Sequence, residues 1–148
     1  MARPTNPPSA RALWYLAPGT AEHRDEILRN PGDDEVLVAT AFTGVSRGTE
    51  RLVMGGRVGR SEWQRMRAPM QAGDFPFPVK YGYCATGIVE AGNKDLIGQP
   101  VFVLHPHQDR FIAPASMATP ILAQSRLISW RMSTCSGWSV GITSIEKN

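Results

Sequence analysis

A hydroxyl-rich segment, residues 43–50 (TGVSRGTE), is the first place along the chain where the residue types could do chemistry. It follows an apolar run and combines two glycines with three hydroxyl side chains and the carboxylate of Glu50. Glycine lets a backbone approach another group closely, and hydroxyls readily hydrogen-bond to nearby groups. We therefore expect a loop here, with its backbone held close to a partner.

A second candidate is the pair of imidazoles in His105-Pro106-His107. Side chains at i and i+2 of a strand point to the same side, as metal ligands must. Pro106 interrupts any strand here, however, and no third ligand is nearby in the sequence. A turn is therefore favoured over a metal site.

Arginines crowd into residues 51–67, where only Glu50 and Glu62 offset them locally. They are Arg51, Arg57, Arg60, Arg65 and Arg67. A solvated helix face and loop would explain such a run, and an anion site is the alternative. The formal net charge of +3 is too small to indicate a nucleic-acid partner.

The elements that must position these residues are short. The 148 residues include 14 glycines and 12 prolines, which interrupt the chain too often for long helices, and the length suits one domain. Apolar runs predict strands over residues 12–16, 35–42, 83–90, 99–104 and 110–113. Five or six strands at this spacing are typical of a barrel or a sandwich.

Other segments have their own signals. Residues 1–11 hold three prolines and are predicted to be a mobile leader, and residues 21–29 suit either an edge strand or one helical turn. Ser61 and Gln64 match a capping box, which predicts a helix running toward Met70. The alternating Phe and Pro of residues 75–78 are predicted to lie extended across the surface.

The sequence also indicates a compartment. It has no run of 18 apolar residues and no N-terminal signal pattern, so we expect a cytoplasmic protein without a membrane partner. Its two cysteines, Cys84 and Cys135, are too few for a disulfide framework and are expected to be thiols.

Four motifs in residues 12–120 occur in an order and spacing that resemble one known family. They are GDDEVLV, TGVSRGTE, YGYCATGIVEAG and IGQPVFVL. The chain resembles the N-terminal, GroES-like domain of the medium-chain dehydrogenases and reductases, the zinc alcohol dehydrogenase superfamily. The resemblance implies a mainly β fold, an irregular and partly open barrel with one short helix. In the family this barrel lies over a separate Rossmann domain, with the substrate cleft between them.

The resemblance also bears on zinc. In zinc members a loop cysteine and the histidine of a G-H-E motif hold a catalytic Zn²⁺, and the matching positions here are Ser46 and Tyr83, with Cys84 in place of the glutamate. Zn²⁺ prefers thiolate, imidazole or carboxylate ligands, and residues 93–98 leave no room for the four-cysteine lobe of a structural zinc. The chain is therefore similar to a zinc-independent branch, and no metal is expected.

The same alignment implies the candidate catalytic residues, Ser46, Thr49, Glu50 and Tyr83. The loop holds one residue more than the family pattern, so either Ser46 or Arg47 occupies the cysteine position. Thr49 would relay a substrate proton, and the phenol of Tyr83, or of Tyr81, would bond a carbonyl in place of the metal. The alternative is that the short polar side chains only bond the loop backbone and that the tyrosines pack on strands.

The likeness stops at Ile121, and residues 121–148 form an atypical tail that contains no G-x-G-x-x-G phosphate loop. Our hypothesis for the tail is a truncated gene or a shifted reading frame, and the alternative is a dedicated short protein whose tail packs on the open barrel. The family's NAD(P) is accordingly not expected to bind this chain alone.

These observations give two functional hypotheses. The first is a truncated alcohol dehydrogenase-like oxidoreductase whose small-molecule alcohol or carbonyl cleft survives, expected to be inactive alone and to self-associate through exposed apolar surface. The second is a noncatalytic GroES-like module that binds a protein or an anion through the barrel edge and residues 57–67.

Overall fold

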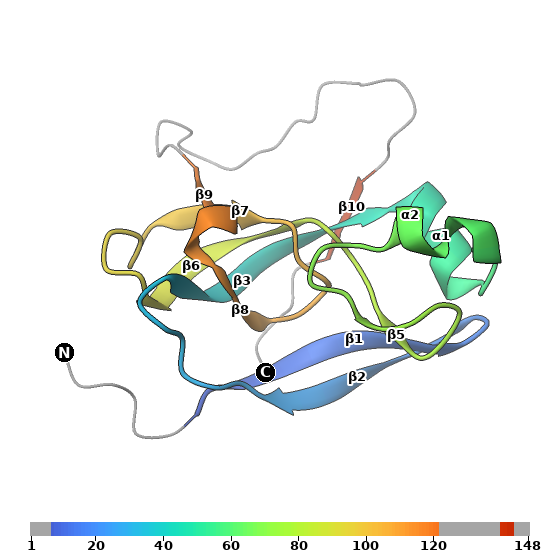
Figure 1. Cartoon of the computed structure of the whole chain (residues 1–148), viewed down its shortest axis with the longest axis horizontal. Coiled ribbons are helices and arrows are strands. Elements are labelled where there is room, and N and C mark those ends of the chain that lie inside the picture. Colours follow the sequence, from blue (N-terminus) through green and yellow to red (C-terminus); the bar gives the residue numbers. More distant parts are fainter. Residues whose placement is uncertain (1–6, 122–139, 144–148) are drawn as a thin grey trace.

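The fold was analysed in a computed structural model that describes residues 7–121 and 140–143 (Figure 1). Its strands are β1 (Ser9–Ala17), β2 (Thr20–Ile27), β3 (Glu35–Ser46), β4 (Ala72–Gly73), β5 (Val79–Lys80), β6 (Ala85–Gly92), β7 (Pro100–Val103), β8 (Arg110–Pro114), β9 (Thr119–Pro120) and β10 (Val140–Thr143). Its helices are α1 (Arg47–Met54) and α2 (Trp63–Met66), with 3-10 turns at Arg60–Glu62 and Ala115–Met117. None of these helices is long and apolar enough to cross a membrane.

The strands form two antiparallel sheets, which Figure 1 shows as two layers. The smaller sheet has the order β2-β1-β5-β4, and the larger has the order β10-β3-β6-β7-β9, with β8 also paired to β3. β3 is the central strand of the larger sheet, because it pairs with β6 along most of its length and with β8 and β10 at its two ends. The predicted mainly β fold is confirmed.

Residues 105–109 join the two sheets through backbone hydrogen bonds. The His107 carbonyl accepts from the Leu13 amide of β1 at 2.9 Å, and the His107 amide donates to the Tyr81 carbonyl at 3.1 Å. The Asp109 amide donates to the Arg11 carbonyl at 3.0 Å. The connection between β7 and β8 is therefore a structural bridge.

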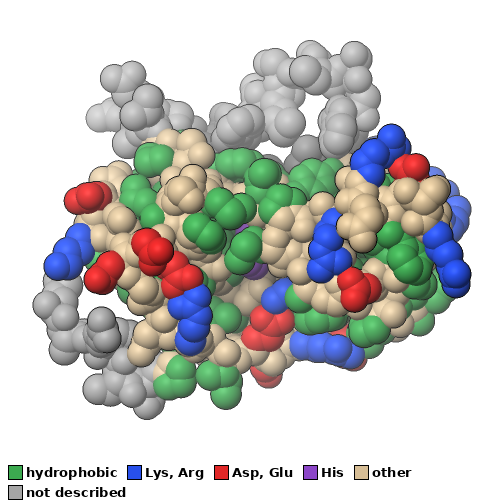
Figure 2. Space-filling model, in the orientation of Figure 1, with side chains coloured by type: hydrophobic (Ala, Val, Ile, Leu, Met, Phe, Trp, Pro, Cys, Tyr) green, Lys and Arg blue, Asp and Glu red, His purple; other side chains and the backbone are tan. Residues whose placement is uncertain are grey.

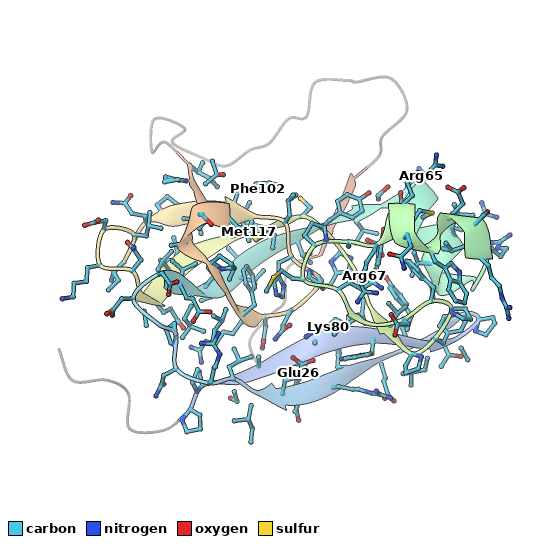
Figure 3. The ribbon with its side chains drawn as sticks, viewed as in Figure 1. Glu26, Arg65, Arg67, Lys80, Phe102 and Met117 are labelled. Atoms are coloured by element: carbon cyan, nitrogen blue, oxygen red, sulfur yellow. The ribbon has the colours of Figure 1, made fainter. Side chains whose placement is uncertain are left out.

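A partly buried ion pair strengthens this junction. The Lys80 ammonium donates to the Glu26 carboxylate at 2.8 and 2.9 Å and to the Gln108 side chain at 2.9 Å. Figure 3 shows Lys80 and Glu26 side by side at the smaller sheet. The pair ties β2, β5 and the bridging segment together, with both charges satisfied by hydrogen bonds.

Two apolar clusters fill the interior. One lies on the larger sheet and is built around Val36, Val38 and Phe111. The other contains Tyr15, Val79 and Val53, and it is covered by the helical region. Val53 is 0 % exposed, so burial of its side chain anchors α1 on the second cluster.

The first strand begins earlier than the sequence predicted. β1 starts at Ser9, so residues 9–11 belong to the sheet and not to a mobile leader, whose residues 1–6 lie outside the described ranges. The reason is a tertiary contact, because the Arg11 amide bonds the Asp109 carboxylate at 2.6 Å. The segment 21–29, left open between strand and helix, forms an edge strand over most of its length, since β2 ends at Ile27.

The prediction of a loop over residues 43–50 was wrong. β3 continues to Ser46 because Thr43 pairs with Ala85 of β6 and Ser46 pairs with Val140 of β10, and α1 follows at Arg47. The structure therefore contains two short α-helices where the resemblance implied one.

The second helix also differs from its prediction. Ser61 lies inside the 3-10 turn without a side-chain cap hydrogen bond, and α2 ends at Met66 instead of reaching Met70. The Trp63 indole donates to the Val58 carbonyl at 3.0 Å, which holds the turn in place of a capping box. Phe75, predicted to lie on the surface, is 5 % exposed and packs against Tyr81, because its ring completes the second apolar cluster. Apart from Ile121 and β10, the predicted tail lies outside the described residues.

His105 gives the fold a pH dependence that can be measured. Its ring is buried and stacked on Phe111, with centroids 3.9 Å apart, and burial lowers its pKa from 6.5 to about 4. The unfolded chain therefore binds this proton first as pH falls, so the stabilisation is complete above pH 6.5 and is lost between pH 6.5 and 4. We expect the free energy of unfolding to fall by about 3 kcal/mol over this window, as measured by urea titrations at each pH. His105→Gln should flatten the curve, and an unchanged slope in that variant would contradict the assignment.

Candidate functional site

The candidate site lies where β3 runs directly into α1. Of the four candidate residues, Ser46 ends β3, Thr49 and Glu50 lie in the first turn of α1, and Tyr83 precedes β6. The structure brings three of them together and turns the fourth, Glu50, elsewhere. No loop separates the strand from the helix, so the positions of Ser46, Thr49 and Glu50 are fixed by regular backbone.

Thr49 is the centre of a hydroxyl cluster. Its Oγ1 accepts hydrogen bonds from the Ser46 hydroxyl at 3.3 Å and from the Tyr83 phenol at 3.4 Å. Ser46 is buried, while Thr49 and Tyr83 are half-buried, so the cluster lies at the edge of the core. We assign Ser46 and Tyr83 as the donors of these two bonds, which leaves the Thr49 proton available to a further acceptor.

Tyr81, the alternative phenol, does not join this cluster. Its hydroxyl donates to the Met66 carbonyl at 3.0 Å, and its ring packs edge-on against Tyr83. Burial raises the pKa of Tyr81 to about 12. Its role is therefore structural, holding the end of α2 to the second apolar cluster.

Glu50 is 5 % exposed and faces the interior. Its two carboxylate oxygens are each occupied, Oε2 by the Tyr15 phenol at 2.7 Å and Oε1 by His107 Nε2 at 2.8 Å. Burial, and then the negative charge of Glu50, raise the pKa of Tyr15, which therefore stays a neutral donor. Glu50 thus connects α1 to β1 and to the bridging segment.

The other nitrogen of His107 continues the network. Nδ1 lies 2.5 Å from the Thr43 hydroxyl, which is also 3.0 Å from the Cys84 carbonyl. A carboxylate can only accept, so the hydrogen of the neutral His107 ring lies on Nε2 and points at Glu50, and Nδ1 then accepts the Thr43 proton. We assign this tautomer from the hydrogen-bond network.

Sequence reasoning missed Tyr15 and His107. A buried carboxylate needs hydrogen-bond donors, so burial of Glu50 would have predicted donor side chains around it. Nothing in the sequence indicated that Glu50 is buried. His107 is 57 residues from Glu50 and was expected in a turn. It does lie in the connection between β7 and β8, yet both His105 and His107 are buried there.

The donor set does not suit a zinc ion. Within residues 7–121 and 140–143, no group of three or more His, Cys, Asp or Glu side chains is placed to hold a metal. Ser46 and Tyr83 offer only hydroxyls, and the Glu50 and His107 atoms that could bind a metal are bonded to each other. Burial raises the pKa of the Cys84 thiol, which disfavours the thiolate that a metal would need.

Most of the arginines predicted as an alternative anion site have intramolecular partners. Arg65 pairs with Glu62, and Arg67 pairs with Asp74 at 2.8 Å. Arg60 lies over the Trp63 ring. Arg65 and Arg67 also lie apart in Figure 3, so residues 60–67 do not present one cationic patch.

Several solved structures share the architecture of this chain. No protein-family model matches the chain, and no curated protein sequence matches it. The quinone oxidoreductase of Thermus thermophilus, solved also with NADPH, aligns with a TM-score of 0.51 and 17 % identity over 77 % of this chain and 33 % of its own. A thermostable alcohol dehydrogenase from Pyrobaculum aerophilum aligns with a TM-score of 0.54 and 18 % identity, over 78 % of this chain and 42 % of its own.

A probable oxidoreductase from Mycobacterium abscessus gives a TM-score of 0.54 and 18 % identity over 78 % of this chain and 35 % of its own. The chain has the GroES-like fold of the medium-chain dehydrogenases and reductases. At these identities the likeness establishes the fold of the GroES-like domain alone. This GroES-like chain spans 33 % to 42 % of the length of the three oxidoreductases.

The buried network can be tested by removing its members singly. Glu50→Ala leaves the Tyr15 and His107 donors buried without an acceptor, so we expect it to cost about 4 kcal/mol of unfolding free energy in a urea titration. Tyr15→Phe loses one hydrogen bond and should cost about 2 kcal/mol. The exposed Glu22→Ala, which breaks only the surface pair with Arg24, is the control and should change little. A Glu50→Ala cost no larger than that of Tyr15→Phe would contradict the network.

Proposed function

We propose that the chain supplies the substrate-facing domain of an NAD(P)-dependent oxidoreductase that acts on small alcohols or carbonyl compounds without a catalytic zinc. The observation that carries this proposal is the meeting of three hydroxyls at Thr49, whose oxygen lies 3.3 Å from that of Ser46 and 3.4 Å from that of Tyr83. The fold shared with a quinone oxidoreductase and an alcohol dehydrogenase supports the assignment.

The chemistry follows from the polarity of the cluster. A carbonyl oxygen gains negative charge as its carbon is reduced, and a donor aimed at that oxygen stabilises the charge. Thr49 donates its proton to this oxygen, and the proton on Thr49 is replaced from the Tyr83 hydroxyl. The half-buried Tyr83 then recovers a proton from solvent, and alcohol oxidation runs the same steps in reverse.

Ser46 acts in this scheme as a positioning residue, and Tyr83 positions Thr49 as well as supplying its proton. Their hydrogen bonds fix the rotamer of Thr49 and direct its remaining proton away from the cluster. Hydrogen bonds in a chain polarise each other, which strengthens Thr49 as a donor. Glu50 contributes by holding α1 in place, since both of its oxygens are bonded to Tyr15 and His107.

The nicotinamide, when bound, supplies the hydride. Dinucleotides bind at the carboxyl ends of parallel strands, beside a helix N-terminus, and the strand pairs of the described residues are antiparallel. These residues therefore do not fit a dinucleotide by themselves. In the proposed enzyme a nucleotide-binding domain completes the cleft.

The proposal can be tested on the isotopically labelled full chain by titration with cyclohexanone. We expect saturable shifts of the Thr49 and Tyr83 amides in heteronuclear NMR spectra. Thr49→Val removes the donor and should weaken ketone binding about tenfold. Tyr81→Phe is the matched control, because it deletes a phenol that bonds Met66, and it should leave ketone binding unchanged.

Two results would contradict the proposal, namely ketone shifts that map away from α1 and a Thr49→Val chain that binds as tightly as the parent. NADPH is the second titrant, and its fluorescence should not change saturably with this chain alone. Saturable NADPH binding would place the nucleotide site within the chain and overturn the assignment of that site to another domain.

A further inference from the structure

A groove of about 510 Å³ runs along α1, between this helix and the turn that joins β1 to β2. Arg47, Arg51 and Arg57 line it together with the aliphatic side chains of Val45 and Met54. The three arginines are exposed, so their guanidinium groups are accessible from solvent. The groove therefore offers apolar walls with cationic groups at its rim.

These three arginines differ from the others in residues 7–121. Six of the others form ion pairs with carboxylates, and Arg60 lies over Trp63. The six are Arg11, Arg24, Arg29, Arg65, Arg67 and Arg110. Within the described part of the chain, no carboxylate forms an ion pair with Arg47, Arg51 or Arg57. Three of the four arginines without a carboxylate partner in this part of the chain thus converge on one groove, and the fourth, Arg60, lies over Trp63.

Glu50 also lines the groove but does not neutralise it. Both of its oxygens accept hydrogen bonds from Tyr15 and His107, and its side chain is 7 % exposed. The carboxylate is therefore directed into the core, and the guanidinium groups dominate the charge at the rim. Figure 2 agrees, since Lys and Arg side chains gather at the end of the molecule that carries α1 and α2.

The groove is separate from the hydroxyl cluster. Arg47, Arg51 and Met54 occupy positions i, i+4 and i+7 and therefore share one face of α1. Thr49, two residues after Arg47, lies roughly 160° around the helix from this face by the 100° step per residue. A ligand in the groove would consequently lie on the opposite side of α1 from the proposed substrate.

We propose that this groove binds the oxyanion group of a small organic molecule, a phosphate or a carboxylate. Guanidinium groups match the planar pairs of oxygens in both anions and hold them by charge-assisted hydrogen bonds. The apolar walls at Val45 and Met54 accept the carbon skeleton of the same ligand. The site is independent of the proposed oxidoreductase function and requires neither a ketone nor a nucleotide.

Calorimetric titration of the full chain tests the site, with pyrophosphate and citrate as probes and sodium chloride at matched ionic strength as the blank. We expect saturable binding of at least one probe and none of chloride beyond the ionic-strength effect. Tighter binding of pyrophosphate indicates a phosphate ligand, and tighter binding of citrate indicates a carboxylate. Saturation by neither probe would overturn the proposal.

Paired variants locate the binding. Arg51→Gln with Arg57→Gln removes two groove charges and should weaken the preferred probe at least tenfold. Arg65→Gln with Arg67→Gln removes the same charge from residues that are paired elsewhere and should change affinity less than twofold. Equal weakening in both double variants would mean that affinity depends only on the net charge of the chain, and it would overturn the proposed groove site.

A second pair of variants guards against a folding defect. Met54 is 38 % exposed, so Met54→Glu and Met54→Gln should both fold, as circular dichroism can verify. Met54→Glu places a negative charge in the groove and should abolish binding, whereas Met54→Gln should retain it. Unchanged affinity in Met54→Glu would overturn the proposal.

Discussion

The structure depends on a carboxylate that is taken out of water. Glu50 is buried on α1, and burying a charge is costly unless it is fully hydrogen-bonded. Its two oxygens meet this need with Tyr15 from the smaller sheet and His107 from the segment that bridges the sheets. The two hydrogen bonds of Glu50 thus hold α1 against β1 and against the connection between β7 and β8.

This arrangement gives α1 two functional faces. On one face Thr49 meets Ser46 and Tyr83, so hydroxyl groups are held at the edge of the core. On the other face arginines without internal counter-ions line a groove. Val53 and Glu50 fix the rotation of the helix between these faces, because the first is fully buried and the second is bonded on both oxygens. The two proposed ligands therefore require no movement of the helix.

Local sequence patterns predicted much of the larger sheet. The apolar run from Glu35 forms β3, and the motif order in residues 12–120 indicated the mainly β, GroES-like fold. The resemblance also selected Ser46, Thr49 and Tyr83, three side chains that do meet. Their meeting depends on the pairing of β3 with β6, which the strand predictions did not include.

The rest depends on contacts between distant residues. The prediction of a loop after Phe42 failed because pairing with β6 and β10 extends β3 to Ser46. The capping box at Ser61 failed because the Trp63 indole bonds the Val58 carbonyl and keeps a 3-10 turn. The Glu50 partner His107 is 57 residues away, and no periodicity connects the two positions.

The nitrogen-bound protons of His107 show directly whether its Nε2 donates to the buried Glu50 carboxylate. Long-range ¹H–¹⁵N spectra of the imidazole at neutral pH distinguish a protonated Nε2 from an unprotonated one. We expect Nε2 to carry a hydrogen whose resonance is shifted downfield by the Glu50 carboxylate, and this shift should be smaller in Glu50→Gln, because an amide oxygen is a weaker acceptor. A neutral ring protonated only at Nδ1 would contradict the account, because Nε2 could not then donate to Glu50 and α1 would not be held by this pair.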